Sequence, residues 1–288
     1  MTFIKKISTF TSLCLLTSIT TFNAIAHERF IVPTHTLLSG DKAQAVTLMA
    51  SISNDIFHPD RALGDSNTGA DVGELKNLFK VLQHSVIAPD GSVSNNTRWQ
   101  AFQRFSVADV WLKESGTYRI GLIQPDVPMT TFKKSDGTPW RLFGKNPAIP
   151  EGATDIVRRT TSSRVETFVS VNSPTMAAVE PTGQGVELSG ETHPNDLYAG
   201  ESASFQLFFK GKPMAIPTSI KVIKAGTRHR NNRNEVSLAV NKDGVFTFTP
   251  QTAGFYFLAA ETSVKVPQPA EYDVKHYSLY LTLEVFPE

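Results

Sequence analysis

Two stretches, Glu114-Ser-Gly-Thr-Tyr-Arg-Ile-Gly-Leu122 and Thr252-Ala-Gly-Phe-Tyr-Phe-Leu-Ala-Ala260, decide the fold. Each leads from a turn through Gly-x-Tyr into an apolar strand. Two earlier stretches also match each other, because residues 37–48 and 197–207 both consist of a strand, a Gly-acidic turn and a second strand. These elements recur in the same order. The repeat therefore predicts an all-β fold of two tandem immunoglobulin-like β-sandwich domains.

The rest of the sequence supports an all-β fold. Short runs rich in Val, Ile, Phe, Thr and Tyr alternate with Gly, Pro, Asn and Asp, which is typical of strands joined by turns. In the last run, Leu279, Leu281 and Leu283 share one side of a strand, which suits a sheet with one buried face. One short helix is expected over residues 72–82, where Leu and Phe recur at helical spacing.

The sequence predicts an N-terminal β-sandwich over residues 27–175 and a C-terminal immunoglobulin-like β-sandwich over residues 181–288. Within the first, the region near 124–161 is poor in strand signal and rich in Pro, Gly and Lys. It is expected to be an irregular insertion, because a long loop of this kind is usually a binding segment or disordered. The apolar patch Trp140-Arg-Leu-Phe-Gly144 is expected to pack over the sandwich or on the second domain.

Residues 1–26 have the pattern of a secretory signal peptide. Lys5 and Lys6 precede a short apolar run, and Ala24 and Ala26 are the small residues that signal peptidase needs at −3 and −1. The apolar run is shorter than the roughly 20 residues of a membrane-spanning helix, and no later run reaches that length. We therefore expect a cleaved signal peptide, a periplasmic protein and no membrane span.

Composition excludes several classes of function. The one cysteine, Cys14, lies in the signal peptide, so the mature chain has no thiolate for a cysteine zinc site or for thiol catalysis. Acidic and basic residues nearly balance, which leaves no basic face of the size that nucleic acid needs. No Gly-x-Ser-x-Gly elbow occurs, and Ile31 stands where a His-Glu-x-x-His helix needs its second histidine. The sequence predicts a binding protein rather than an enzyme.

Cleavage after Ala26 would leave His27 as the first residue, with a free amine and an imidazole that can chelate one metal ion. The amine has a pKa of about 7.7–8.0, so a divalent metal can displace its proton near neutrality. Such nitrogen pairs favour copper and nickel over zinc. Further ligands are needed, and the candidates are His58 and His193, which both precede proline, and His276, which precedes the last strand. The alternative is that His27 merely follows the cleavage site.

Seven blocks of the sequence carry a resemblance: Ala26-His-Glu-Arg-Phe-Ile-Val-Pro33, Ser53-Asn-Asp-Ile-Phe57, Ala88-Pro-Asp-Gly91, Gly116-Thr-Tyr-Arg-Ile120, Arg164-Val-Glu-Thr-Phe-Val-Ser-Val171, His193-Pro-Asn-Asp-Leu-Tyr-Ala-Gly-Glu201 and Asn241-Lys-Asp-Gly-Val-Phe-Thr-Phe248. In their order along the chain they resemble one bacterial periplasmic family, domain-of-unknown-function family 4198. Members of this family typically begin with Ala-His-aromatic-Leu-x-Pro after the signal peptide. The family is described as related to periplasmic components of nickel and cobalt uptake systems. The resemblance implies metal handling, at His27 and also at His58, His193 and His276.

Two functions therefore remain open from the sequence. The first is a periplasmic protein that binds a divalent metal ion, namely nickel, cobalt or copper, as a carrier or an accessory to metal uptake. An outer-membrane metal receptor or an uptake transporter would then be its partner. The second is a β-sandwich module that binds a glycan, a peptide or a surface partner without metal, because a fold of this kind does not itself define function.

Overall fold

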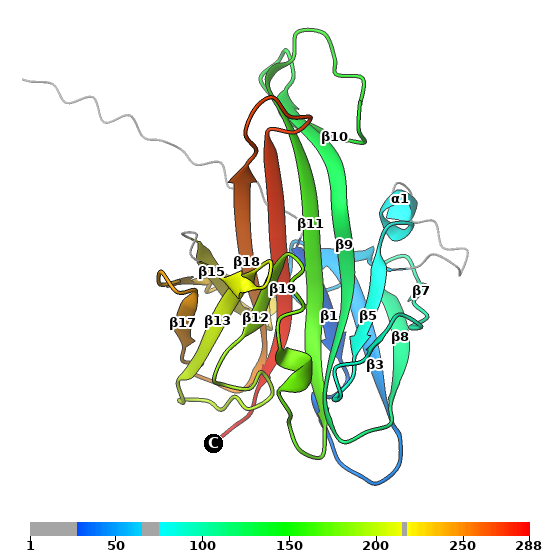
Figure 1. The fold of residues 1–288 in the computed structure, drawn as a ribbon, viewed down its shortest axis with the longest axis vertical. Coiled ribbons are helices and arrows are strands. Elements are labelled where there is room, and N and C mark those ends of the chain that lie inside the picture. Colours follow the sequence, from blue (N-terminus) through cyan, green and yellow to red (C-terminus); the bar gives the residue numbers. More distant parts are fainter. Residues whose placement is uncertain (1–27, 65–74, 215–217) are drawn as a thin grey trace, which may run out of the picture.

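The computed structural model describes residues 28–64, 75–214 and 218–288. Three β-sheets account for nearly all of its regular structure (Figure 1). The largest, the central sheet, has the strand order β16-β15-β18-β19-β11-β9-β5-β6, with β10 beside β9 and β2 beside β11. Its strands are β2 (Leu37–Leu38), β5 (Gln83–Ile87), β6 (Val93–Ser94), β9 (Gly116–Lys133), β10 (Pro139–Phe143), β11 (Thr154–Val171), β15 (Ser219–Lys224), β16 (Val236–Ala239), β18 (Gly254–Lys265) and β19 (Val274–Val285).

Two smaller sheets complete the fold. The first outer sheet consists of β1 (Glu28–Pro33), β3 (Gln44–Ser53), β4 (Arg61–Ala62), β7 (Gln100–Ala101) and β8 (Ser106–Leu112). The second outer sheet consists of β12 (Val186–Ser189), β13 (Ala203–Phe209), β14 (Lys212–Pro213) and β17 (Val245–Phe248).

In the described part of the chain, helical structure is confined to short segments: α1 (Leu75–Phe79), η1 (Ala177–Val179) and η2 (Thr227–His229). The helix expected over residues 72–82 is confirmed at 75–79, while residues 72–74 lie outside the described part of the chain. Within that described part, no helix is both long enough and apolar enough to cross a membrane.

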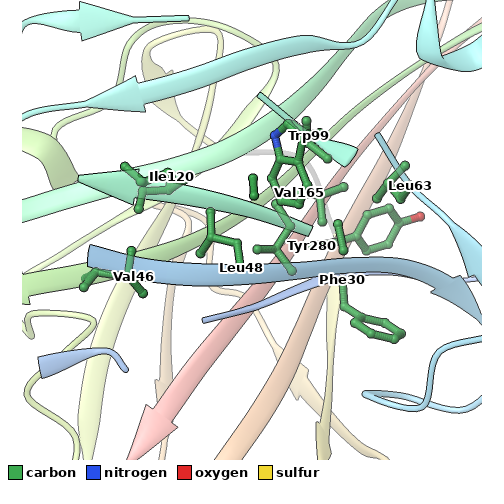
Figure 2. Close-up of a cluster of buried hydrophobic side chains, with 14 of the residues drawn as sticks. Phe30, Val46, Leu48, Leu63, Trp99, Ile120, Val165 and Tyr280 are labelled. Atoms are coloured by element: carbon green, nitrogen blue, oxygen red, sulfur yellow. The ribbon is translucent and has the colours of Figure 1, made fainter. Parts of the chain in front are cut away.

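The central sheet contributes to two separate hydrophobic cores. Figure 2 shows the first, in which Phe30 and Leu48 of the first outer sheet pack with Ile120, Val165 and Tyr280 of the central sheet. In the second core, Phe168, Leu258 and Leu281 of the central sheet pack with Leu207 of the second outer sheet. Successive side chains of a strand point to opposite faces. The two outer sheets therefore cover opposite faces of the central sheet.

This arrangement confirms an all-β, β-sandwich fold and the shared face of Leu279, Leu281 and Leu283, which all lie in the second core. It also adds a connection that the sequence did not reveal. Strand β11 pairs in parallel with β19 over Arg159–Thr167 and Val274–Thr282. The central sheet is thus continuous across the predicted boundary between residues 175 and 181, and the division into two domains stays a prediction.

The repeated Gly-x-Tyr stretches form two similar corners. The Tyr118 hydroxyl accepts hydrogen bonds from the backbone N–H groups of Lys113 and Glu114, at 3.1 and 2.8 Å, and donates to the Glu114 carbonyl at 3.2 Å. The Tyr256 hydroxyl donates to the Thr252 carbonyl, also four residues upstream, at 2.7 Å. A tyrosine that returns to the backbone just before its strand is a hallmark of immunoglobulin-like sandwiches.

The expected irregular insertion at 124–161 is wrong. Strand β9 continues to Lys133 and β11 begins at Thr154, with β10 between them, and these strands extend well beyond the outer sheets (Figure 1). The pairing of β11 with β9 contains two register shifts, between Thr154 and Val157 and between Thr161 and Ser163. A bulge interrupts the alternation by which strands are detected. Because no outer sheet covers these ends of β9 and β11, neither face of the strands has to carry a row of apolar side chains.

The expected packing of Trp140-Arg-Leu-Phe-Gly144 is also wrong. Trp140 is 50% exposed and Phe143 is 61% exposed. Both belong to β10, which pairs with β9 at the far end of the long strands. This end of the sheet lies beyond both outer sheets (Figure 1), which agrees with the exposure of the two rings.

Candidate functional site

The first described residue, Glu28, holds the start of β1 in place. It is only 4% exposed, and its Cα lies opposite Ser53 of β3. Its carboxylate pairs with Lys221 of β15, with Nζ and Oε1 3.1 Å apart, and with Arg233. His27 precedes this fixed point but lies outside the described residues.

Arg29 connects β1 to the central sheet. Its Nη1 donates to Gln124 Oε1 and to Ser163 Oγ, both at 2.7 Å. Burial lowers the pKa of the Arg29 guanidinium, and the positive charge of Arg141 lowers it further. The start of β1 thus lies over the face of β9 and β11 that also carries the first core.

A histidine and a carboxylate face each other on the same face of the central sheet. His276 Nε2 lies 4.0 Å from Glu261 Oε2, and Tyr280 donates its hydroxyl to Glu261 Oε1 at 2.9 Å. The other ring nitrogen of His276, Nδ1, lies 3.0 Å from Ser263 Oγ. The four residues come from the paired strands β18 and β19, where Ser263 lies opposite His276.

Electrostatics keep His276 neutral near pH 7. Burial lowers the pKa of its imidazole, Glu261 raises it in part, and Arg159 lowers it again. A neutral imidazole is the form that binds metals. Two atoms that each lie about 2.0–2.2 Å from one metal are at most about 4.4 Å apart, so the nitrogen and the carboxylate oxygen are close enough to share an ion.

Arg29 and this pair belong to one neighbourhood. Burial raises the pKa of the Tyr280 hydroxyl. The positive charge of Arg29 acts on the same hydroxyl and partly opposes this rise. Tyr280 in turn holds Glu261. We call His276, Glu261, Ser263 and Tyr280, together with the start of β1, the β1 site.

His193, by contrast, has a structural position. Its Nδ1 accepts the Asn195 backbone N–H at 3.0 Å, so the proton lies on Nε2, which is 3.1 Å from the Thr175 carbonyl and 2.9 Å from Thr117 Oγ1. Burial also lowers the pKa of this imidazole. Both nitrogens are therefore used within the protein, and His193 would have to break a hydrogen bond to hold a metal.

His58 lies in the turn between β3 and β4. Its backbone N–H donates to the Asp55 carbonyl at 3.1 Å, and Thr227 of η2 donates to Asp55 Oδ1 at 2.9 Å. The turn follows Ser53, whose Cα lies opposite that of Glu28. Within the described ranges, however, no three His, Cys, Asp or Glu side chains gather to hold a metal ion.

Sequence reasoning selected His276 but missed Glu261, Tyr280 and Arg29. One signal was present: Glu261 interrupts an otherwise apolar run that begins at Phe255. Which residue faces His276 depends on strand register, and a one-residue slip would put Glu261 on the other face.

A second polar cluster lies between the central sheet and the second outer sheet. Arg119 and Arg164 both pair with Glu166, at 2.8 and 2.7 Å, and Arg119 also pairs with Glu187 at 3.2 Å. All four side chains are at most 4% exposed. Burial alone would raise the pKa of Glu166, but the two arginines outweigh it and hold that pKa at about 2. Glu166 is therefore ionised at neutral pH, where it pairs with both arginines.

The chain belongs to a known family. The profile described as Domain of unknown function (DUF4198) matches residues 24–264. This confirms the family suggested by the sequence blocks and assigns no activity. No protein of curated function matches the sequence at a significant level.

Several solved structures show only distant similarity. The D0-D1 domain of Intimin is 10% identical to this chain, with a TM-score of 0.21. The match covers 89% of this chain and 97% of the Intimin chain. Alpha-2-macroglobulin of Escherichia coli is 10% identical over 89% of this chain and 31% of its own, with a TM-score of 0.22. A DUF4785 family protein of Legionella pneumophila is 9% identical over 80% of this chain and 50% of its own, with a TM-score of 0.23. Similarities at this level carry no argument about function.

Proposed function

We propose that this protein is a periplasmic binding protein for a divalent metal ion, namely nickel, cobalt or copper, and not an enzyme. The amine and imidazole of a mature N-terminal His27 would supply two nitrogen ligands, and His276 and Glu261 would supply the others. The observation that carries the proposal is the His276–Glu261 pair on the sheet face over which the start of β1 lies.

Covalent geometry supports the participation of the N-terminus. Consecutive Cα atoms are about 3.8 Å apart, so the position of Glu28 limits where the Cα atom of the preceding residue can lie. Glu28 is held there by Lys221 and Arg233. Anchoring the strand removes part of the entropy that assembling a site from a free terminus would otherwise cost.

The donor set supports the choice of metals. Imidazole and amine nitrogens suit nickel, cobalt and copper, and in comparable geometry they bind copper and nickel more tightly than zinc. The hydrogen bond between Ser263 and His276 Nδ1 is the outer contact that fixes the orientation of a ligating imidazole. A carrier or uptake accessory fits this donor set, and its partner would be an outer-membrane metal receptor or an uptake transporter.

Calorimetric titration with Ni²⁺ tests the proposal on the processed chain. We expect His276→Ala and Glu261→Gln each to weaken binding by at least about tenfold, since outer and inner metal contacts are typically worth 10–100-fold. His84→Ala is the matched control, because His84 lies on β5, away from this pair. Equal affinity in all four proteins would refute the assigned ligands.

A further inference from the structure

Strand β10 is an unpaired edge of the central sheet. It pairs with β9 over Pro139–Phe143 and Met129–Lys133, and within the described residues it has no partner on its other side. Figure 1 shows it near the far end of the long strands, beyond both outer sheets. Natural sheets usually protect such an edge, because it is a template for pairing with another chain.

The free backbone groups of this edge can be identified. In the β9–β10 hairpin, Lys134 N–H donates to the Thr138 carbonyl at 2.9 Å, and Gly144 N–H donates to the Pro128 carbonyl at 2.9 Å. Hydrogen-bonded pairs alternate along an antiparallel ladder. Trp140 and Leu142 therefore bond to β9, while the N–H and C=O groups of Arg141 and Phe143 point outward.

The side chains of β10 are exposed on both faces of the sheet. Trp140 lies opposite Phe132 and Phe143 lies opposite Met129. The two rings are three positions apart along the strand, so they point to opposite faces. Trp140 is 50% exposed and Phe143 is 61% exposed. An added strand could be contacted by one ring on each face.

The charge around this edge is positive. Lys133 pairs with Asp155 and Lys145 pairs with Glu271, but the two arginines of this edge, Arg141 and Arg159, have no ion-pair partner among the described residues. Arg141 lies opposite Thr131, and Arg159 Nη2 donates to Thr131 Oγ1 at 2.9 Å, so both arginines flank one threonine. Within the described part of the chain, neither arginine has a carboxylate within 4.0 Å, and the Lys134 ammonium instead lies 3.7 Å from the centre of the Trp140 ring. Asp136 in the hairpin turn is the acid closest in sequence.

We propose that β10 accepts an extended, acidic segment of a partner protein as an added strand. The outward groups of Arg141 and Phe143 would supply the main-chain hydrogen bonds, which give affinity in this mode of recognition. The arginines would select negative side chains. This inference goes beyond metal binding and does not depend on it.

Two other binding partners for the β10 edge, a lipid bilayer and a second copy of this chain, fit less well. A lipid bilayer would leave the outward backbone groups unsatisfied, and open sheet edges do not occur in hydrocarbon. A second copy of this chain, paired antiparallel about the centre of β10, would place Arg141 opposite Arg141, and like charges directly opposite each other are destabilising.

Fluorescence anisotropy on the full secreted chain tests the proposal, in buffer with a chelator so that the metal site plays no part. The probe is a labelled heptapeptide that alternates Glu and Val, compared with one that alternates Lys and Val. We expect saturable binding of the Glu peptide below about 1 mM, at least about tenfold weaker binding with Arg141→Glu, and no binding of the Lys peptide.

Backbone variants separate strand addition from simple charge attraction. Phe143→Pro deletes one outward N–H without touching the ladder to β9, and Phe143→Ala keeps that N–H while deleting the ring. We expect the proline variant to bind at least about tenfold more weakly than the alanine variant, with equal thermal melting. Trp111→Ser removes a 63% exposed ring on β8 and should change nothing.

Several results would overturn the proposal. Failure of the Glu peptide to bind, equal binding of the two peptides, or equal binding of the proline and alanine variants would each do so. Binding to phosphatidylglycerol vesicles that the Glu peptide does not compete for would assign the surface to lipid instead. Dimerisation in sedimentation that Arg141→Glu abolishes would assign it to a second copy.

Discussion

At the scale of single residues, the charged side chains fall into two groups. One group is buried and forms ion pairs within the fold, and the other lies at the proposed binding surfaces. Arg119, Arg164, Glu166 and Glu187 are buried and pair with one another, although Nε and Nη1 of Arg119 have no hydrogen-bond partner. The Glu187 carboxylate also accepts the backbone N–H groups of residues 182–184. Such a cluster costs much less when complete than when one member is missing, because the remaining charges would then be buried and unpaired.

Glu166→Gln is therefore expected to destabilise the protein strongly. Removing one partner of a buried pair typically costs about 3–5 kcal/mol, and here two arginines would be left without it. The free energy of unfolding in urea gives the measurement. Asp60→Asn is the control, since its partner Arg104 is exposed, and it should cost less than about 1 kcal/mol. Equal losses in the two variants would contradict this role.

The same carboxyl predicts a pH dependence. The pKa of Glu166 is lowered from 4.5 to about 2 in the folded state, which corresponds to about 3 kcal/mol of stability. Because the folded pKa is depressed, this stability is present above about pH 4.5 and is lost as the pH falls toward 2. The difference in unfolding free energy between wild type and Glu166→Gln should shrink over that range. A difference that stays constant would contradict the assignment.

Site residues show what the sequence alone can reveal at this scale. The expected cleavage site of a signal peptide indicated His27, and the position before the last strand indicated His276. Glu261 and Arg29 could not be assigned, because their proximity to His276 depends on the register of β18 with β19 and on the crossing of β1 over the central sheet. Neither is encoded in a local pattern.

At the scale of elements, the two tyrosine corners explain why the Gly-x-Tyr repeat is visible in the sequence. Each corner fixes the entry of a central strand, β9 or β18, and each tyrosine packs in a different core. The strands inside the sandwich were predictable because buried faces impose an apolar pattern. The far halves of β9 and β11 were not, since bulges and exposure on both faces remove that pattern.

Tyr118→Phe and Tyr256→Phe test the corners. We expect a loss of about 1–3 kcal/mol for Tyr118, whose hydroxyl satisfies two backbone N–H groups, and of about 0.5–1.5 kcal/mol for Tyr256. The losses should add within about 0.5 kcal/mol in the double variant, because the two sites share no partner. Urea unfolding provides the values, and a larger loss for Tyr256 would contradict the hydrogen-bond account.

At the scale of the whole molecule, the central sheet unites two cores that the sequence suggested to be separate domains. Val165 and Phe168 lie three residues apart on β11 and enter different cores. The parallel pairing of β11 with β19 joins the N-terminal and C-terminal parts of the chain. Such a continuous sheet links the stability of one core to that of the other.

Unfolding should therefore be one cooperative transition. Leu48→Ala in the first core and Leu207→Ala in the second are each expected to cost about 2–5 kcal/mol, and each should lower the midpoint of the same transition. Calorimetry together with tyrosine and tryptophan fluorescence follows both cores at once. Two transitions, each shifted by one variant only, would show that the cores unfold independently.

The central claim is that a free N-terminal amine on His27 completes a metal site with His276 and Glu261. The most direct measurement is Ni²⁺ affinity by calorimetry for the chain that begins at His27, compared with the same chain carrying one extra alanine before it. The account predicts at least about tenfold weaker binding with the added residue, because the amine is then a peptide nitrogen that cannot chelate in the same ring. Equal affinity in the two proteins, or no Ni²⁺ binding by either, would contradict it.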